Sequence, residues 1–119
     1  MEQFRFRNWK VYRDAQELFC VVLSVVRKLP KEFRFEIGSQ IIRSALSILL
    51  NIAEGSGKSS DKEMNRFLEI SLGSVYETLA AIDALEYNGF ITKTECEKVE
   101  RLLASISRQL GGLKKRLDS

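Results

Sequence analysis

Apolar residues recur along this chain at alternating spacings of three and four, which is the period of an amphipathic α-helix. In the first such run, apolar residues continue from Tyr12 to Leu29, and Pro30 then prevents the helix from continuing. No window shows the sustained two-residue alternation that is typical of a β-strand. The pattern therefore predicts an all-α chain, with helices over about residues 8–28, 32–54, 61–87 and 93–117.

Residues suited to helix ends lie between the predicted helices. Ser60 and Glu63 have the spacing of a capping box, in which side chains satisfy free backbone N–H groups at a helix start. Thr92 and Glu95 have the same spacing, and we interpret Gly55 as the stop of the second helix. Because the connections are short, consecutive helices should lie antiparallel. The expected architecture is an up-down-up-down four-helix bundle that forms one domain over residues 1–119.

The second predicted helix is more apolar than a small bundle requires. No charged residue lies between Arg43 and Glu54, and apolar side chains cover roughly half of the helix surface, against about 100° for an ordinary amphipathic helix. They form two adjacent stripes, which begin at Ile41 and Ile42. One stripe suits the core of the bundle and the other suits a neighbouring subunit, and periodicity does not distinguish them. The residues predicted to contact a neighbouring subunit are Ile42, Leu46, Leu49, Leu50 and Ala53.

Length and composition favour a single domain. The chain has 119 residues, of which 45% are hydrophobic, and this is enough to bury a core. Cys20 and Cys96 form no CxxC pair, so neither a zinc site nor a disulfide framework is indicated. Residues 1–10 lack the pattern of a signal peptide, and the longest uncharged run has about half the length of a membrane-spanning helix. We therefore expect a cytoplasmic protein without a membrane partner.

The chain contains no histidine, which removes several sites that helical bundles commonly hold. Di-iron bundles use Glu-x-x-His pairs, many hydrolases use an imidazole base, and haem is often held by histidine. Gly57-Lys58-Ser59 matches only the last three positions of a phosphate-binding loop, and it follows a predicted helix instead of a strand. We predict no metal, no cofactor and no catalytic residues, and we expect that the protein is not an enzyme.

Basic residues gather at one end of the predicted bundle. The whole chain has a net charge of +3, but eleven basic and six acidic residues at this end give +5, whereas the opposite end, residues 25–40 and 78–100, has −1. Such a surface suits the phosphate backbone of RNA or DNA, and a solvated surface that maintains solubility is the alternative. The basic residues of this end, called the basic end below, are Arg5, Arg7, Lys10, Arg13, Lys58, Lys62, Arg66, Arg108, Lys114, Lys115 and Arg116.

Two stretches of the chain carry a family resemblance. The first reads QIIRSALSI from Gln40, NIAEG from Asn51 and GK from Gly57, and the second reads FLEI from Phe67 with GS and Glu77 after it. Over residues 9–117 this pattern resembles the four-helix-bundle proteins named after the intervening sequences of bacterial 23S rRNA genes. Many relatives have a proline where this chain has Leu49.

The resemblance implies a homopentameric ring, similar to the accessory protein of diversity-generating retroelements, which binds nucleic acid and a reverse transcriptase. The resemblance implies no set of catalytic residues. For its polar motif positions we prefer a pairing or capping role to ligand binding, because polar groups in a helix interface must be satisfied. These positions are Gln40, Arg43, Asn51 and Glu54.

We therefore predict a non-enzymatic oligomeric binding protein that associates with RNA or DNA through the basic end, without sequence readout. The alternative is a protein-interaction scaffold, or an accessory subunit that does not touch nucleic acid. The expected partners are further copies of this chain, RNA or DNA, and a nucleic-acid-processing protein.

Overall fold

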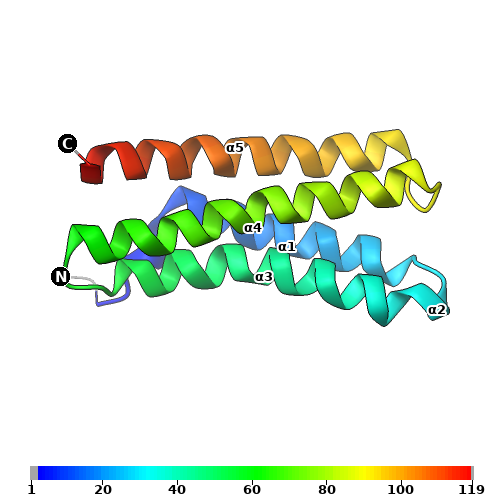
Figure 1. The fold of residues 1–119 in the computed structure, drawn as a ribbon, viewed down its shortest axis with the longest axis horizontal. Coiled ribbons are helices and arrows are strands. Elements are labelled where there is room, and N and C mark those ends of the chain that lie inside the picture. The colour runs from blue at the N-terminus through cyan, green and yellow to red at the C-terminus, as the bar shows by residue number, and fades with distance from the viewer. Residues whose placement is uncertain (1–2, 119) are drawn as a thin grey trace.

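The computed structural model describes residues 3–118, and the regular secondary structure in this range is entirely helical (Figure 1). The prediction of an all-α chain with four long helices is confirmed for these residues. A short 3₁₀ helix, η1 (Arg5–Asn8), comes first. It is followed by α1 (Lys10–Arg27), α2 (Lys31–Arg34), α3 (Glu36–Ser56), α4 (Asp61–Tyr87) and α5 (Lys93–Asp118).

The four long helices lie along the longest dimension of the molecule, which is 45 Å. In Figure 1, α1 and α4 run from left to right, whereas α3 and α5 run from right to left. Helix α3 packs against both α1 and α4, and α5 packs against both α4 and α1, so the helices surround one core. The start of α1, the connection from α3 to α4 and the end of α5 therefore lie at the same end (Figure 1).

The second predicted helix differs most from its expected bounds. Its first turn is the separate α2, and α3 begins only after Phe35. Helix α3 then continues beyond Gly55 and is capped by Gly57. A Cβ atom on Gly55 would lie 3.0 Å from the Cβ of Phe67 and 3.3 Å from the carbonyl oxygen of Met64. The interpretation of Gly55 as a helix stop is wrong, because this glycine instead allows α3 and α4 to approach each other closely.

Both predicted capping sites are formed. The Oγ1 of Thr92 accepts a hydrogen bond from the N–H of Glu95 at 3.1 Å, and the Oε1 of Glu95 accepts one from the N–H of Thr92 at 2.9 Å. At the start of α4, the Oγ of Ser60 accepts a hydrogen bond from the N–H of Glu63 at 3.1 Å. The carboxylate of Glu63 pairs with Arg66 instead of reaching back. Helix α5 thus begins with a complete capping box, and α4 begins with half of one.

Glu95 also connects α5 to α1, because its carboxylate forms an ion pair with Lys28. The hydrogen bond from Lys28 and the backbone hydrogen bond from Thr92 lower the pKa of Glu95 below its ordinary value of 4.5. A carboxyl group with a lowered pKa stabilises the fold at pH values above its unfolded pKa, and this contribution is lost as the pH falls through the folded pKa.

We expect Glu95→Gln to lower the free energy of unfolding at neutral pH, because the variant loses the ion pair with Lys28. The difference between variant and wild type should shrink as the pH falls from 4.5 through the lower pKa of folded Glu95, because wild-type Glu95 then becomes neutral as well. Urea unfolding at a series of pH values measures this difference. A difference that stays constant across the acidic range would contradict the assigned role of the charge.

The core takes up most of the apolar surface of α3. The stripe that begins at Ile41 is fully buried, and Leu49 of the second stripe is buried as well. Because α3 packs against α1 on one side and α4 on the other, its wide apolar arc is largely covered within one chain. Leu49 is therefore not available to a neighbouring subunit, whereas Leu50 remains 51% exposed. The half-buried residues of the second stripe are Ile42, Leu46 and Ala53.

Hydroxyl groups define the register between α3 and α4. The Oγ of Ser71 donates a hydrogen bond to the carbonyl oxygen of Ile48 at 2.8 Å, and the hydroxyl oxygens of Ser44 and Thr78 lie 2.8 Å apart. All three hydroxyl-bearing residues are buried. Since a buried polar group without a partner is costly, a shift of one helix along the other is disfavoured.

Candidate nucleic-acid interface

The fold brings the basic end together from three separate parts of the chain (Figure 1). Four of its residues lie in η1 and the start of α1, three lie in the connection to α4 and its first turns, and three lie in the last turns of α5. Arg108 is the exception, because it lies ten residues before the end of α5. That separation is about 15 Å along the helix axis, so Arg108 belongs to the flank of the bundle.

Carboxylates offset part of this charge. The Nζ of Lys114 lies 3.0 Å from the Oε1 of Glu69, which was not among the acidic residues expected at this end. The pairing depends on how α4 and α5 lie against each other, and helical periodicity does not reveal it. The local excess of positive charge is therefore smaller than predicted. Other ion pairs at the basic end are Lys10–Asp14 at 2.6 Å, Lys58–Glu54 at 4.0 Å and Arg66–Glu63 at 3.6 Å.

The carboxylate of Asp14 joins α1 to α5. It accepts hydrogen bonds from the Nζ of Lys10 at 2.6 Å and from the Nε2 of Gln109 at 2.8 Å. Partial burial alone would raise the pKa of Asp14, but these hydrogen bonds and the positive charge nearby lower the pKa below its ordinary value of 3.8. Asp14 is therefore ionised at neutral pH, and it holds both donors in place.

Several basic side chains at this end lie against aromatic rings. The Cζ of Arg5 is 5.5 Å from the centroid of the Trp9 ring. The Nζ of Lys58 and the Cζ of Arg66 lie 4.9 Å and 5.2 Å from the centroid of the Phe67 ring. A cation over an aromatic face keeps its charge while its side chain is restrained. Arg5 therefore adds to the positive potential of the end, whereas the charges of Lys58 and Arg66 are offset by Glu54 and Glu63.

Apart from Arg108 on the flank, three exposed residues of the basic end have side chains with no described ion pair, hydrogen bond or ring contact. Arg7, Lys62 and Lys115 are exposed, and their side chains form no ion pair or hydrogen bond with any residue in the range 3–118. They come from η1, α4 and α5, which are far apart in the sequence. We call them the open basic residues. Their donors are available to an anionic partner such as a phosphate.

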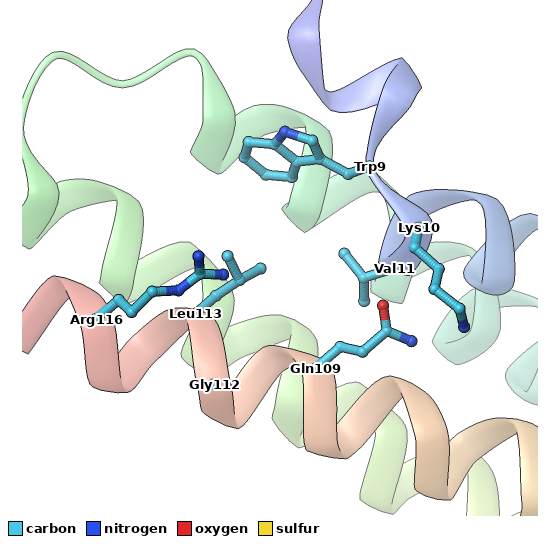
Figure 2. Close-up of a pocket in the computed structure, with 7 residues that line it drawn as sticks. All are labelled: Trp9, Lys10, Val11, Gln109, Gly112, Leu113 and Arg116. Atoms are coloured by element: carbon cyan, nitrogen blue, oxygen red, sulfur yellow. The ribbon is translucent and has the colours of Figure 1, made fainter.

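A groove of about 580 Å³ opens between the start of α1 and the last turns of α5 (Figure 2). Figure 2 shows the ring of Trp9 on one side, with Leu113 and Arg116 of α5 projecting toward it from the other side. The volume falls within the range of about 300–1,000 Å³ that is usual for small-ligand sites. The residues that line this α1–α5 groove are Trp9, Lys10, Val11, Gln109, Gly112, Leu113 and Arg116.

The sequence pattern did not indicate this groove. Trp9 and Gln109 belong to none of the motifs, and the hydrogen bond from Gln109 to Asp14 spans 95 positions of the chain. One local signal was present, because Gly111 and Gly112 interrupt an otherwise regular helical repeat. Glycine inside a helix is unfavourable, so two in succession suggest a local requirement for space.

The polar positions of the family motif lie mostly in solvent. Gln40, Arg43 and Glu54 are exposed. The amide of Asn51 donates hydrogen bonds to the carbonyl oxygen of Ser47 at 2.8 Å and to its Oγ at 2.9 Å. Asn51 therefore makes a structural contact within α3, Glu54 pairs with Lys58, and Gln40 and Arg43 remain exposed.

The described residues offer no metal-binding cluster, and the thiol of Cys96 is not activated. No three His, Cys, Asp or Glu side chains in the range 3–118 are placed to hold a metal ion. Burial, together with the neighbouring carboxylate of Asp83, raises the pKa of the Cys96 thiol, and such a thiol is a poor nucleophile at neutral pH. None of the helices in this range has both the length and the apolar character needed to cross a membrane.

The fold and the basic end place this chain in the class of helical-bundle proteins whose positive charge gathers at one end. Residues 7–112 match the family described as the 23S rRNA-intervening sequence protein, and the chain belongs to this family. The resemblance carried by the QIIRSALSI and FLEI stretches is thereby confirmed.

The chain is also similar to a solved structure. A protein of unknown function from the S23 ribosomal protein family of Bacteroides thetaiotaomicron matches with a TM-score of 0.82 and 24% sequence identity. The match covers 88% of this chain and 98% of that protein, and at this identity it shows a shared fold. The comparison with curated proteins found no match.

Proposed function

We propose that the protein is a non-enzymatic binding protein that associates with RNA or DNA in the cytoplasm, without reading the sequence. The observation that carries this proposal is the position of the open basic residues. Arg7, Lys62 and Lys115 project from different elements at one end of the bundle, and no described carboxylate offsets them. Exposed cations in this arrangement suit phosphate oxygens, which every nucleic acid presents regardless of its sequence.

The proposal includes assembly of the chain into a homopentameric ring. A single chain with a few phosphate contacts would bind weakly, whereas several linked basic ends would bind one strand together and gain avidity. Two large apolar side chains support such assembly. Leu50 of α3 is 51% exposed and Ile70 of α4 is 42% exposed, and contact with a neighbouring chain would cover both.

The open basic residues can be tested against a matched set at the opposite end. We expect replacement of Arg7, Lys62 and Lys115 with glutamine to lower the affinity for mixed-sequence RNA or DNA, because three phosphate contacts are lost. The slope of log affinity against log salt concentration should fall by about one for each lost contact. Fluorescence anisotropy of a labelled oligonucleotide over a series of salt concentrations measures both quantities. The control with the same change in net charge replaces Lys31, Lys93 and Lys98.

Equal losses of affinity in the two variants would mean that binding depends on the net charge of the protein and not on the position of the charges at the basic end. Absence of binding at low salt in the wild type would refute the proposal itself.

The second candidate function, a protein-interaction scaffold for a nucleic-acid-processing protein, is favoured by the exposed rings of Phe35 and Tyr87 at the opposite end. Recovery of one stoichiometric protein partner after nuclease treatment would support the scaffold.

A further inference from the structure

The α1–α5 groove lies beside the basic end, and Gly112 of α5 leaves part of its floor free of a side chain. A Cβ atom on Gly111 or Gly112 would meet no atom within 4 Å, so packing inside the bundle does not require glycine at either position. Glycine in a helix interior is nevertheless unfavourable relative to alanine. Gly112 lines the groove, and a larger residue there would extend into the open space. Gly112 therefore leaves this part of the groove open.

The walls of the groove combine an aromatic ring with groups that recognise a nucleotide. Trp9 supplies an indole, and Lys10 and Arg116 supply cations from opposite walls (Figure 2). Asp14 offsets part of the charge of Lys10, which it contacts at 2.6 Å. The groove remains positive on balance because Arg5 lies 5.5 Å from the Trp9 ring centroid and adds a further cation. An aromatic surface next to cations is the combination with which proteins hold single-stranded nucleic acid.

Gln109 presents a hydrogen-bond acceptor of fixed orientation. Its Nε2 donates to the Oδ2 of Asp14 at 2.8 Å and to the Oγ of Ser105 at 3.2 Å. A carboxylate can only accept, so the amide nitrogen must face Asp14. The Oε1 then has no hydrogen-bond partner among residues 3–118, and Figure 2 shows it directed toward Val11 at the groove. This oxygen suits a ligand that donates an N–H group.

We propose that the α1–α5 groove binds one unpaired nucleotide of a single-stranded RNA or DNA. The base stacks on Trp9, an N–H group of its Watson–Crick edge donates a hydrogen bond to the Oε1 of Gln109, and the phosphates on the two sides of the nucleotide lie toward Arg116 on one wall and Lys10 on the other. This inference rests on the proposed nucleic-acid binding and names the form of nucleic acid that the basic end prefers. A duplex cannot occupy the groove in this way, because its bases are already stacked and paired. Every base can offer this acceptor an N–H group at its Watson–Crick edge, cytosine from its amino group and uracil from its ring N–H, so the contact requires an unpaired base and selects no sequence.

Trp9 is the only tryptophan of the chain, so its fluorescence reports on the groove directly. The probes are a mixed-sequence single strand of about ten nucleotides, which is within the usual site size, and the same strand annealed to its complement. We expect the single strand to quench Trp9 and the duplex to leave it unchanged. Gly112→Phe should abolish the quenching and lower single-strand affinity about tenfold, while duplex affinity is retained. Gly111→Phe is the matched control, because Gly111 is exposed and does not line the groove, and it should behave as the wild type.

A second variant tests the groove without filling it. Gln109→Leu should bind a single-stranded oligocytidine about fivefold more weakly than the wild type does, which is the effect of one lost hydrogen bond, while its duplex affinity is retained. Cytidine monophosphate alone should bind far more weakly than the strand. Equal affinity for cytidine monophosphate and for the strand would show that the ligand is a free nucleotide and would overturn the assignment to a strand.

The outcomes separate this inference from the proposed function. If Gly112→Phe leaves quenching and affinity unchanged while glutamine at the open basic residues abolishes binding, the groove inference fails and the proposed function stands. If neither strand nor duplex binds the wild type, both fail. Light scattering of Gly112→Phe should show the same mass as the wild type. A smaller mass would assign the groove to contact between subunits and would overturn the inference.

Discussion

Simultaneous replacement of Leu50 and Ile70 with glutamate is expected to convert the proposed ring into folded monomers. Ser71 of α4 donates a hydrogen bond to the carbonyl oxygen of Ile48 in α3, so Leu50 and Ile70 lie close to the same level of the bundle. Full burial of an apolar side chain of this size contributes about 1.5–3 kcal/mol, and about half of each side chain is already covered, so loss of both weakens each subunit contact by about 1.5–3 kcal/mol, or roughly ten- to a hundredfold. Size-exclusion chromatography with light scattering measures the mass.

The matched control places two glutamates at other exposed apolar positions. Phe35→Glu with Tyr87→Glu introduces the same charge at side chains that are 82% and 89% exposed, and it should leave the mass unchanged. Both double variants should remain helical by circular dichroism, since none of the four side chains is buried. A wild-type protein that is already monomeric, or a Leu50 and Ile70 variant that keeps its mass, would rule out this surface as the contact.

Gly55 lies where α3 and α4 approach each other closely. We expect Gly55→Leu to lower the free energy of unfolding by about 1–3 kcal/mol or more, because the new side chain must displace Phe67 and the backbone of α4 at Met64. For a domain of this size, each kcal/mol corresponds to a fall of about 4 °C in melting temperature. Thermal and urea unfolding measure the change.

Gly111→Leu is the control, since a Cβ atom at that position meets no neighbour. This substitution should be neutral or stabilising by up to about 1 kcal/mol, because leucine has a higher helix propensity than glycine. The two variants make the same chemical change inside a helix and should differ in sign. Similar stability of the two would show that α3 and α4 tolerate a wider separation.

The helices and their caps were accessible from sequence because they depend on neighbours in the chain. The seam of α4 from Met64 to Leu85 is buried as the spacing of three and four predicted, and so is the seam of α5 from Cys96 to Leu110. Leu113 and Leu117, which the same spacing places on the α5 seam, are only half-buried. The hydrogen bonds between Thr92 and Glu95 likewise involve residues three apart. The basic end followed from the reversal of direction between helices.

Other features depended on contacts that periodicity does not encode. An apolar arc on α3 is equally compatible with a second helix of the same chain and with a neighbouring subunit, and in this fold α1 covers much of it. In the same way, the charge of Lys114 is offset by Glu69, and this pairing follows from the rotation and displacement of α5 relative to α4.

Hydrophobic period, capping residues and charge were therefore sufficient to establish an all-α chain of four long helices with one basic end, because these properties act over a few residues. The close approach of α3 and α4 at Gly55 and the groove between Trp9 and Gly112 arise only when separate helices are packed. Both are set by side-chain volumes across an interface, and such volumes have no signature in the spacing of residues along a single helix.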